Sequence, residues 1–239
     1  MWHAKNSGGY TRLSTEATDN AQEICAILID EFGWTLEAAA GAIGNMQYEV
    51  GLNPWRWESE HMLTQQQARD AYEPSGWEYS PGYGLIGWTP AKKYQFNNAT
   101  FWYHGQLYQY FPNYDQESYP GYGPNWSDVP GSVMDGAAQV RLLATAMSRR
   151  SGNIWIDHSG HLNSVDYISI NTTPEYAAQE FWYGAENSKS PSSISTRQTY
   201  AREIYDWLVE HGYQPSGGGI VPQIMLLIMA TVNKWILKL

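Results

Sequence analysis

The segment from Glu73 to Gly131 limits what this chain can fold into. It is rich in Gly, Pro, Tyr and Trp, as in "YSPGYGLIGWTP" and "YFPNYDQESYPGYGPNWSDVPG", and it has little periodicity. This composition is typical of loops and short hairpins. A loop this long is usually functional or disordered, and its dense aromatic side chains favour a function. The sequence therefore predicts a mainly α fold, with some α+β character, in which helices flank a long aromatic loop or small hairpin region.

Two helices are expected before this segment. Residues 17–32 carry apolar side chains at helical spacing and stop at Gly33. Thr35 can then cap a second helix through "LEAAAGAIGNMQY", whose small residues permit close contact between helices.

Further helix signals are spread over the rest of the chain. Thr64 with Gln67 has the spacing of a capping box, and so has Ser195 with Gln198 at the start of a helix over 196–211. A helix is also expected over 132–150, and another begins at Thr173 and Pro174, with proline at the first helical position.

The predicted organisation is one main domain with short appendages. Residues 1–15 form an N-terminal arm without the apolar core of a secretory signal, 16–212 form the domain, and "YQPSGGG" at 213–219 forms a linker. Residues 220–239, "IVPQIMLLIMATVNKWILKL", are almost wholly apolar. They could insert into a membrane as a short helix, or pack on a partner chain or on the domain itself.

Charge and aromatic content restrict the class of partner. The net charge is −10, which disfavours adhesion to nucleic acid or to an anionic bilayer. The chain has 12 Trp and 18 Tyr but only 5 Phe, and rings with a polar edge suit a partly wet surface. This pattern is expected of a protein that stacks sugar rings.

The sequence gives little support for metal or thiol chemistry. Cys25 is the only cysteine, so no intramolecular disulfide forms, and its place on an apolar helix face predicts a core residue. His158 and His161 lack further ligands at zinc-type spacing, and we expect both at the surface. Neither a metal nor a cofactor is predicted.

Glu49 is the candidate for acid chemistry. It stands just before "GLNP", where Gly51 and Pro54 end the second helix, and a helix C-terminus disfavours a negative charge. Four apolar neighbours are expected to desolvate its side chain and act in the same direction: Ile43, Met46, Trp55 and Trp57. Both effects favour a neutral carboxyl, which can protonate a glycosidic oxygen. The alternative is a solvated glutamate at a fraying helix end.

Two sequence blocks resemble the phage tail lysozyme family of peptidoglycan-cleaving domains. They are "GWTLEAAAGAIGNMQYEVGLNPWRWES" and "YGLIGWTPAKKY", and fainter similarity extends over about residues 16 to 212. The resemblance implies a lysozyme-like fold in which Glu49 is the catalytic acid and the block from Gly84 to Pro90 lines a sugar-binding cleft opposite it. It also implies peptidoglycan glycan strands as substrate and delivery on a phage tail, with 220–239 as a candidate attachment to tail proteins or a membrane.

The chain departs from the family at two positions. Val50 replaces a serine that many relatives carry after the glutamate, which weakens a transglycosylase mechanism. Gly87 stands where the family commonly has glutamine, so a hydrogen bond to the substrate is lost.

The remaining site residues are predicted from their places in the two blocks. Glu58 is the favoured second carboxylate, although a mechanism with Glu49 alone and a held water is equally allowed. Six residues are candidates for substrate contact, the aromatic ones by stacking on sugars or by packing in the core: Gln47, Tyr48, Trp55, Tyr83, Trp88 and Thr89.

Three functions remain open from the sequence. The first is a glycoside hydrolase that cleaves peptidoglycan with Glu49 as general acid. The second is a lytic transglycosylase that uses the same acid without water. The third is a wall-binding or structural tail module that has lost activity.

Overall fold

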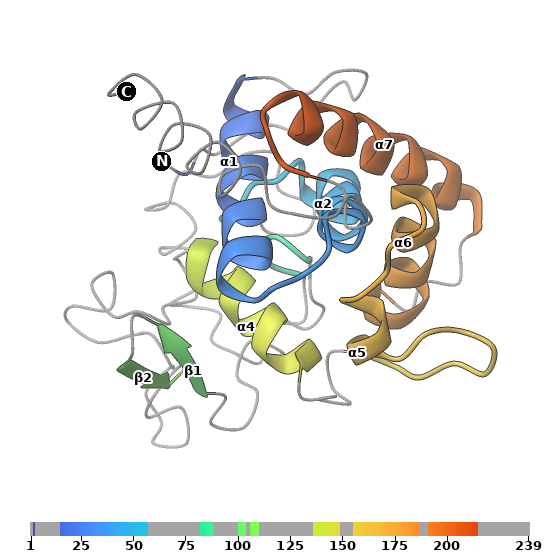
Figure 1. The fold of residues 1–239 in the computed structure, drawn as a ribbon. Helices are drawn as coiled ribbons and strands as arrows, with labels where there is room; N and C mark the ends of the chain where they lie inside the picture. The colour runs from blue at the N-terminus through green and yellow to red at the C-terminus, as the bar shows by residue number, and fades with distance from the viewer. Residues whose placement is uncertain are drawn as a thin grey trace, which may run out of the picture.

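The computed structural model describes residues 2, 15–56, 82–87, 100–103, 106–109, 136–148, 155–186 and 191–214. These residues are mainly helical, as the sequence predicts (Figure 1). The capping box at Thr64 and the segment 220–239 lie outside them. In the part of the chain that is described, no helix has the length and apolar character needed to cross a membrane.

The first predicted helix is confirmed, with a change of winding near its end. Helix α1 spans Thr15–Cys25 and continues as a π-helix over Ala26–Glu31. Gly33 follows with a φ of +71°, a left-handed conformation that glycine adopts easily. Trp34 then leads into the next helix.

Helix α2 (Leu36–Val50) lies at the centre of the fold, in contact with α1, α6 and α7 (Figure 1). Its N-terminus is capped as predicted, since the Thr35 hydroxyl accepts a hydrogen bond from the Ala38 amide at 3.2 Å. Gly51 ends the helix in a left-handed conformation, with a φ of +63°.

Helices α6 (Pro174–Phe181) and α7 (Ile194–Glu210) pack on α2 and on each other. A π-helix, Trp182–Glu186, follows α6, and a 3₁₀ turn, Pro191–Ser193, precedes α7. The predicted cap of α6 is confirmed, because Thr173 Oγ1 accepts from the Tyr176 amide at 3.1 Å.

The predicted start of α7 is wrong. Ser195 lies inside the helix, which begins at Ile194, and Ser193 takes the N-cap position without a side-chain capping bond. The Ser193 hydroxyl instead accepts a hydrogen bond from Arg197 Nε at 3.3 Å, a contact between residues four apart in the chain. The helix ends at Glu210, and Gly212 follows with a φ of +98°, as expected of a stop.

Two glycines let the helices approach α2 closely. A Cβ on Gly41 would lie 2.5 Å from Ala177 Cβ on α6, and one on Gly44 would lie 2.7 Å from the Ala201 nitrogen on α7. Real Cβ atoms do not approach other atoms this closely, so neither position has room for a side chain. The predicted role of small residues in close helix contact is therefore confirmed.

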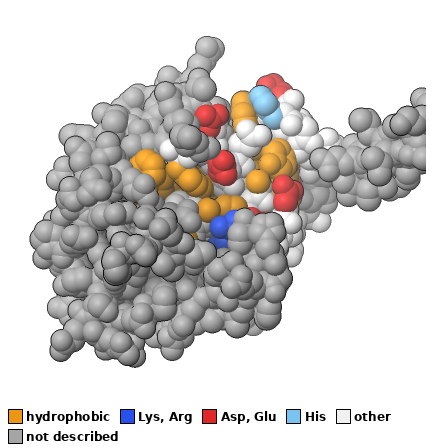
Figure 2. Space-filling model, turned by 90° about the vertical axis from the view of Figure 1, so that its left-hand side faces the viewer, with side chains coloured by type: hydrophobic (Ala, Val, Ile, Leu, Met, Phe, Trp, Pro, Cys, Tyr) orange, Lys and Arg blue, Asp and Glu red, His pale blue; other side chains and the backbone are white. Residues whose placement is uncertain are grey.

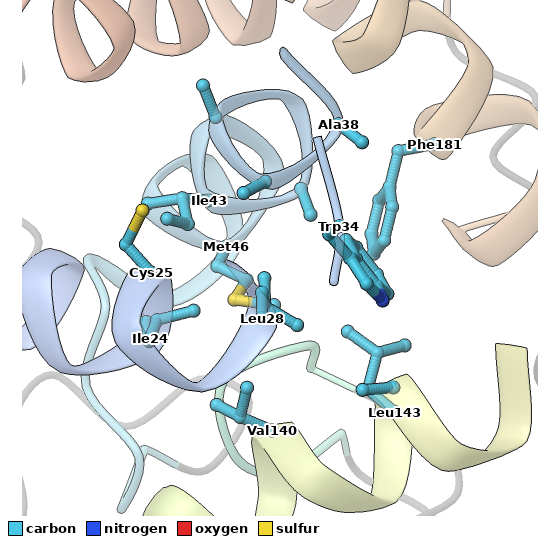
Figure 3. Packing of buried hydrophobic residues seen from close by; sticks show 14 of the residues in the cluster. Ile24, Cys25, Leu28, Trp34, Ala38, Ile43, Met46, Val140, Leu143 and Phe181 are labelled. Atoms are coloured by element: carbon cyan, nitrogen blue, oxygen red, sulfur yellow. The ribbon is translucent and has the colours of Figure 1, made fainter. Parts of the chain in front are cut away.

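Helix α4 (Gly136–Ser148) and the short helix α5 (Ser164–Tyr167) complete the helical part of the described chain. The expected core forms between α1, α2, α4 and α6, as Figure 3 illustrates. Cys25 is fully buried in it, and burial, followed by the charge of Asp30, raises the pKa of its thiol far above the ordinary value. The assignment of Cys25 to the core is confirmed.

A small antiparallel hairpin lies within the predicted loop region. Strand β1 (Thr100–Tyr103) pairs with β2 (Gln106–Gln109), with Thr100 opposite Gln109 and Tyr103 opposite Gln106. The hairpin contacts α4 and lies away from α6 and α7 (Figure 1).

Candidate active site

Glu49 occupies the last turn of α2, one residue before the helix ends at Val50. Its side chain is 30% exposed, so Glu49 is partly enclosed and part of its side chain reaches solvent. Met46 and Ile43, one and two turns earlier, are fully buried in the core. The helix end and the apolar neighbours before it are therefore as the sequence predicts.

A buried arginine, which the sequence analysis missed, meets this carboxyl group. Arg197 of α7 donates from Nη2 to Glu49 Oε1, and the two groups form an ion pair. The Arg197 side chain is only 2% exposed. The apolar neighbours expected from the sequence are thus not the whole of its surroundings, because one of its two oxygens also faces a cation.

The guanidinium of Arg197 is held by three further groups. Nη1 donates to Asn45 Oδ1 at 2.9 Å, and Nε donates to Ser193 Oγ. The Tyr48 ring lies against the guanidinium, with Cζ 4.2 Å from the ring centroid, within the range of a cation–π contact. Desolvating a charge is costly unless it is paired, and these contacts pair the buried arginine.

Asn45 connects this site to the packing of the helices. Its side chain is fully buried, and its Nδ2 donates to the carbonyls of Gly41 at 2.9 Å and Ala178 at 3.0 Å. The same amide therefore joins α2, α6 and, through Arg197, α7. Gly44 permits the approach of α7 that brings Arg197 within reach.

The described part of the second sequence block, residues 82–87, comes close to Glu49 at Gly87. A Cβ built on Gly87 would lie 3.7 Å from Glu49 Cβ and 4.0 Å from Glu49 Oε2. Gly87 has a φ of +63° and its amide donates to the Gly84 carbonyl at 3.0 Å, which forms a tight turn. The block from 82 to 87 thus approaches the oxygen of Glu49 that Arg197 does not hold.

Gln139 of α4 joins the two blocks. It is fully buried, its Oε1 accepts from the Leu85 amide at 2.9 Å, and its Nε2 donates to the Pro54 carbonyl at 2.8 Å. In addition, the Gly84 amide donates to the Arg56 carbonyl at 3.0 Å. One glutamine therefore fixes the turn after α2 against the block that faces Glu49.

The predicted substrate-contact residues divide into three groups. Tyr48 is 37% exposed beside Arg197, and Trp55 is partly buried against the core. Gln47 is nearly buried, and its Oε1 has no hydrogen-bond partner among the described residues. Trp88 and Thr89 lie outside the described ranges, and so does Glu58, the predicted second carboxylate.

Tyr83 does not offer a ring for stacking in this structure. Its side chain is fully buried and belongs to the hydrophobic core. Leu85 and Ile86, in the same block, are buried there too, because the block packs inward as it crosses toward Glu49. Tyr83 is therefore a packing residue, the alternative that the sequence also allowed.

The two histidines are less exposed than predicted. His161 Nδ1 lies 3.0 Å from Glu180 Oε1, and the His161 ring lies 3.8 Å from that of Tyr183. Glu180 is buried, and its other oxygen accepts a hydrogen bond from the Leu162 amide at 2.8 Å. Because buried polar groups need hydrogen-bond partners, His161 serves as the partner of the remaining Glu180 oxygen. Within the described ranges, no group of three or more His, Cys, Asp and Glu side chains is arranged to hold a metal ion.

A sequence signal for Arg197 did exist. Arg197 stands on the apolar stripe of α7, seven residues before Ile204 and eleven before Leu208. A charged residue on the buried stripe of an amphipathic helix needs a buried partner, which Glu49 and Asn45 provide.

Acidic side chains are present on one face of the described residues. On the face in Figure 2, acidic side chains lie among hydrophobic ones over the part of the chain that is described. This agrees with a partner that is not bound through general positive charge.

Comparison with known proteins places these features in a family. Residues 19–208 match the phage tail lysozyme family. A curated relative, Morphogenesis protein 1 of Bacillus phage B103, is 37% identical over 94 residues, which make up 39% of this chain. The matched region is 21% of that relative, so the chain spans about a fifth of the relative's length.

Proposed function

Because the chain belongs to the phage tail lysozyme family, we propose that it cleaves the glycan strands of bacterial peptidoglycan, with Glu49 as the general acid. The observation that carries this proposal is the placement of Glu49. Its carboxyl group is partly exposed at the end of α2, is anchored on one oxygen by Arg197, and faces the Gly87 turn with the other.

In the proposed reaction, Glu49 protonates the oxygen between two amino sugars as the bond to the sugar carbon breaks. Positive charge develops on the ring, and a water molecule adds to it. The water gives up a proton, which restores the acid. Whether Glu58 helps to activate this water is a further prediction from sequence, and a mechanism with Glu49 as the single carboxylate is the alternative.

Substrate contacts are proposed at residues of the two sequence blocks. Tyr48 has an exposed part that can lie against a sugar. Gln47 is proposed as a contact from its place in the sequence block; its Oε1 is buried in this structure, so a sugar would reach it only after neighbouring atoms move. Trp55, Trp88 and Thr89 are proposed as further contacts. The requirement for orientation in such a site explains why rigid rings and buried amides occur near the acid.

Delivery by a phage tail would fit the charge of the chain. A net charge of −10 gives no attraction to an anionic wall, and a tail that carries the domain to the wall removes the need for it. The segment 220–239 is proposed as an attachment to other tail proteins or to the membrane. Deleting residues 213–239 should abolish leakage of liposomes and leave wall cleavage intact if this segment meets the membrane.

The direct test is Glu49→Gln, measured as reducing sugar released from purified peptidoglycan. We expect a loss of about 10³-fold in rate, because a general acid contributes about 10²–10⁴-fold. Glu175→Gln is the matched control, since Glu175 also pairs with an arginine of α7 but lies in the first turn of α6. Parental activity in Glu49→Gln would refute the assignment.

Product analysis separates the proposed hydrolase from its alternatives. Hydrolysis leaves reducing ends, whereas anhydromuramyl ends in the mass spectrum would establish a lytic transglycosylase. Binding to the wall without release of any fragment, from acid to neutral pH, would establish a non-catalytic module.

A further inference from the structure

We propose that Arg197 is the positioning residue of Glu49: its guanidinium holds Oε1, which leaves Oε2 as the oxygen that carries the proton and transfers it. This inference rests on the proposed function, in which Glu49 is the acid. It adds a residue on α7 and assigns separate tasks to the two oxygens of one carboxyl group.

The assignment of the oxygens follows from the chemistry of the guanidinium. An arginine side chain remains protonated in proteins and has donors only, with no acceptor. Because Arg197 Nη2 donates to Glu49 Oε1, that oxygen must act as an acceptor. When Glu49 is protonated, its proton therefore resides on Oε2.

The position of Oε2 suits this task. It faces Gly87, where even an added Cβ would remain 4.0 Å away, and the native glycine has no side chain to cover it. The Glu49 side chain is 30% exposed, so part of it can be reached by a ligand from outside. Arg197 lies on the buried side, with only 2% of its side chain exposed.

Arg197 can fix the orientation of Glu49 because its own position is fixed. Three of its nitrogens have separate acceptors, on Glu49, Asn45 and Ser193, so rotation of the guanidinium would break contacts in three directions. Tyr48 lies against its plane. An acid held this way needs little reorganisation when a glycosidic bond is bound beside it.

The ion pair also favours the chemical step over binding. As the proton moves from Oε2 to the glycosidic oxygen, the C–O bond breaks with its electron pair remaining on that oxygen, and Glu49 becomes a carboxylate. A charged acceptor strengthens the hydrogen bond from Arg197, so the contact is stronger after proton transfer than before it. The water that adds to the sugar carbon later returns a proton to Oε2.

The charged and titratable groups around Glu49 are few within the described residues. Arg197 approaches from α7, and the phenol of Tyr48 is the neighbour on α2. From the facing block the contact is Gly87, which has no ionisable side chain. Arg197 is therefore the described charged group in contact with the acid.

The test is Arg197→Ala, assayed on soluble glycan-strand fragments with and without millimolar guanidinium chloride. We expect kcat to fall about 100-fold and KM to change less than about 2-fold, the pattern of a lost transition-state contact. Free guanidinium should recover about tenfold in kcat by occupying the vacated site, while equal sodium chloride should not. Arg202→Ala, on the same helix, is the matched control and should keep the parental kcat.

A second variant tests the proposal in case Arg197→Ala does not fold. Arg197→Lys keeps the charge but cannot reach three acceptors at once, and we expect a fall in kcat of about 10-fold with a native circular dichroism spectrum. If Arg197→Ala does not fold, Arg197→Lys decides the question. A parental kcat in either folded variant, or a loss confined to KM, would overturn the proposal.

The outcomes separate this inference from the function on which it rests. Activity retained by Glu49→Gln would reject the proposed function itself. Activity lost in Glu49→Gln but unchanged in the folded Arg197 variants would reject only the positioning role.

Discussion

Two glutamate–arginine pairs join α7 to its neighbours, and they differ in how the arginine is held. Arg197 is almost fully buried and binds Asn45 and Ser193 as well as Glu49. Arg202, five residues later, is 40% exposed and makes two hydrogen bonds to Glu175, at 2.6 and 2.7 Å, with Asp206 at 3.6 Å. The second pair connects two helices at the surface, whereas the first fixes one carboxyl group against the interior.

The difference shows that an ion pair alone does not identify a site. An exposed pair contributes little to stability because water and salt screen it. A buried arginine requires several acceptors. Because these acceptors hold the arginine in place, the single partly exposed glutamate that it binds has a fixed orientation. The support around the arginine is therefore the feature to test.

The largest effect is expected from removing the support of Arg197. Asn45→Ala deletes three buried hydrogen bonds and leaves part of the guanidinium unpaired, so we expect a loss of about 2–4 kcal/mol in the free energy of unfolding. Asp206→Ala, which removes the corresponding neighbour of Arg202, should cost less than about 0.5 kcal/mol. Urea denaturation of both variants measures the difference. Equal losses would contradict the view that Arg197 is held more firmly than Arg202.

The approach of α7 to α2 gives the next effect. Gly44→Ala places a Cβ 2.7–2.8 Å from atoms of Ala201 and forces α7 outward. We expect a net loss of about 1–2 kcal/mol, after the roughly 1 kcal/mol by which alanine favours a helix over glycine.

Activity measured in parallel should fall in Gly44→Ala, because Arg197 moves with α7. Ser195→Ala, exposed on the same helix, is the control and should lie within about 0.5 kcal/mol of the parent. A loss near 1 kcal/mol in the control would indicate that Ser195 caps α7 after all.

A smaller effect is expected at the start of α6, where Glu175 is held. Thr173→Ala removes the acceptor of the Tyr176 amide and should cost about 1 kcal/mol. Thr173→Ser keeps the hydroxyl and should retain most of the stability. Because this helix end supports the second pair, kcat should remain at the parental value in both variants.

The smallest effect is the pH dependence of the second pair. Hydrogen bonds from Arg202 hold the pKa of Glu175 below its ordinary value of 4.5. A lowered pKa in the folded state contributes stability above the ordinary value, and this contribution is lost as the pH falls through the lowered pKa. Both side chains are more than a third exposed, so we expect an advantage of less than about 1 kcal/mol over Glu175→Gln at pH 6.

The check is to measure urea denaturation of both proteins at pH 6 and at successively lower pH. The advantage over Glu175→Gln should shrink below about pH 4.5. If the stability difference between the parent and Glu175→Gln did not change with pH, the ion pair of Glu175 with Arg202 would not be its source.

The elements that the sequence predicted well depend on local chemistry. Thr35, Gly51 and Thr173 act within one turn of their own helices, so their types and spacing were sufficient. Glu49 was found in the same way, because Gly51 marks the helix end at which Glu49 stands.

The features that the sequence did not predict depend on partners far along the chain. The partner of Glu49 is 148 residues away. Glu180 gave no local sign that it would be buried and would draw in His161. Tyr83 was ambiguous, because an aromatic residue in a Gly-rich block suits both a surface and a core.

The separation between Glu49 and Arg197 has a consequence for the order of synthesis. The helix that bears the acid leaves the ribosome before α7, which emerges almost 150 residues later. Until then the carboxyl group lacks its anchor and Asn45 lacks one of its partners. A nascent or truncated chain that ends before α7 would therefore carry the acid without the geometry proposed for cleavage, so that activity becomes linked to completion of the domain.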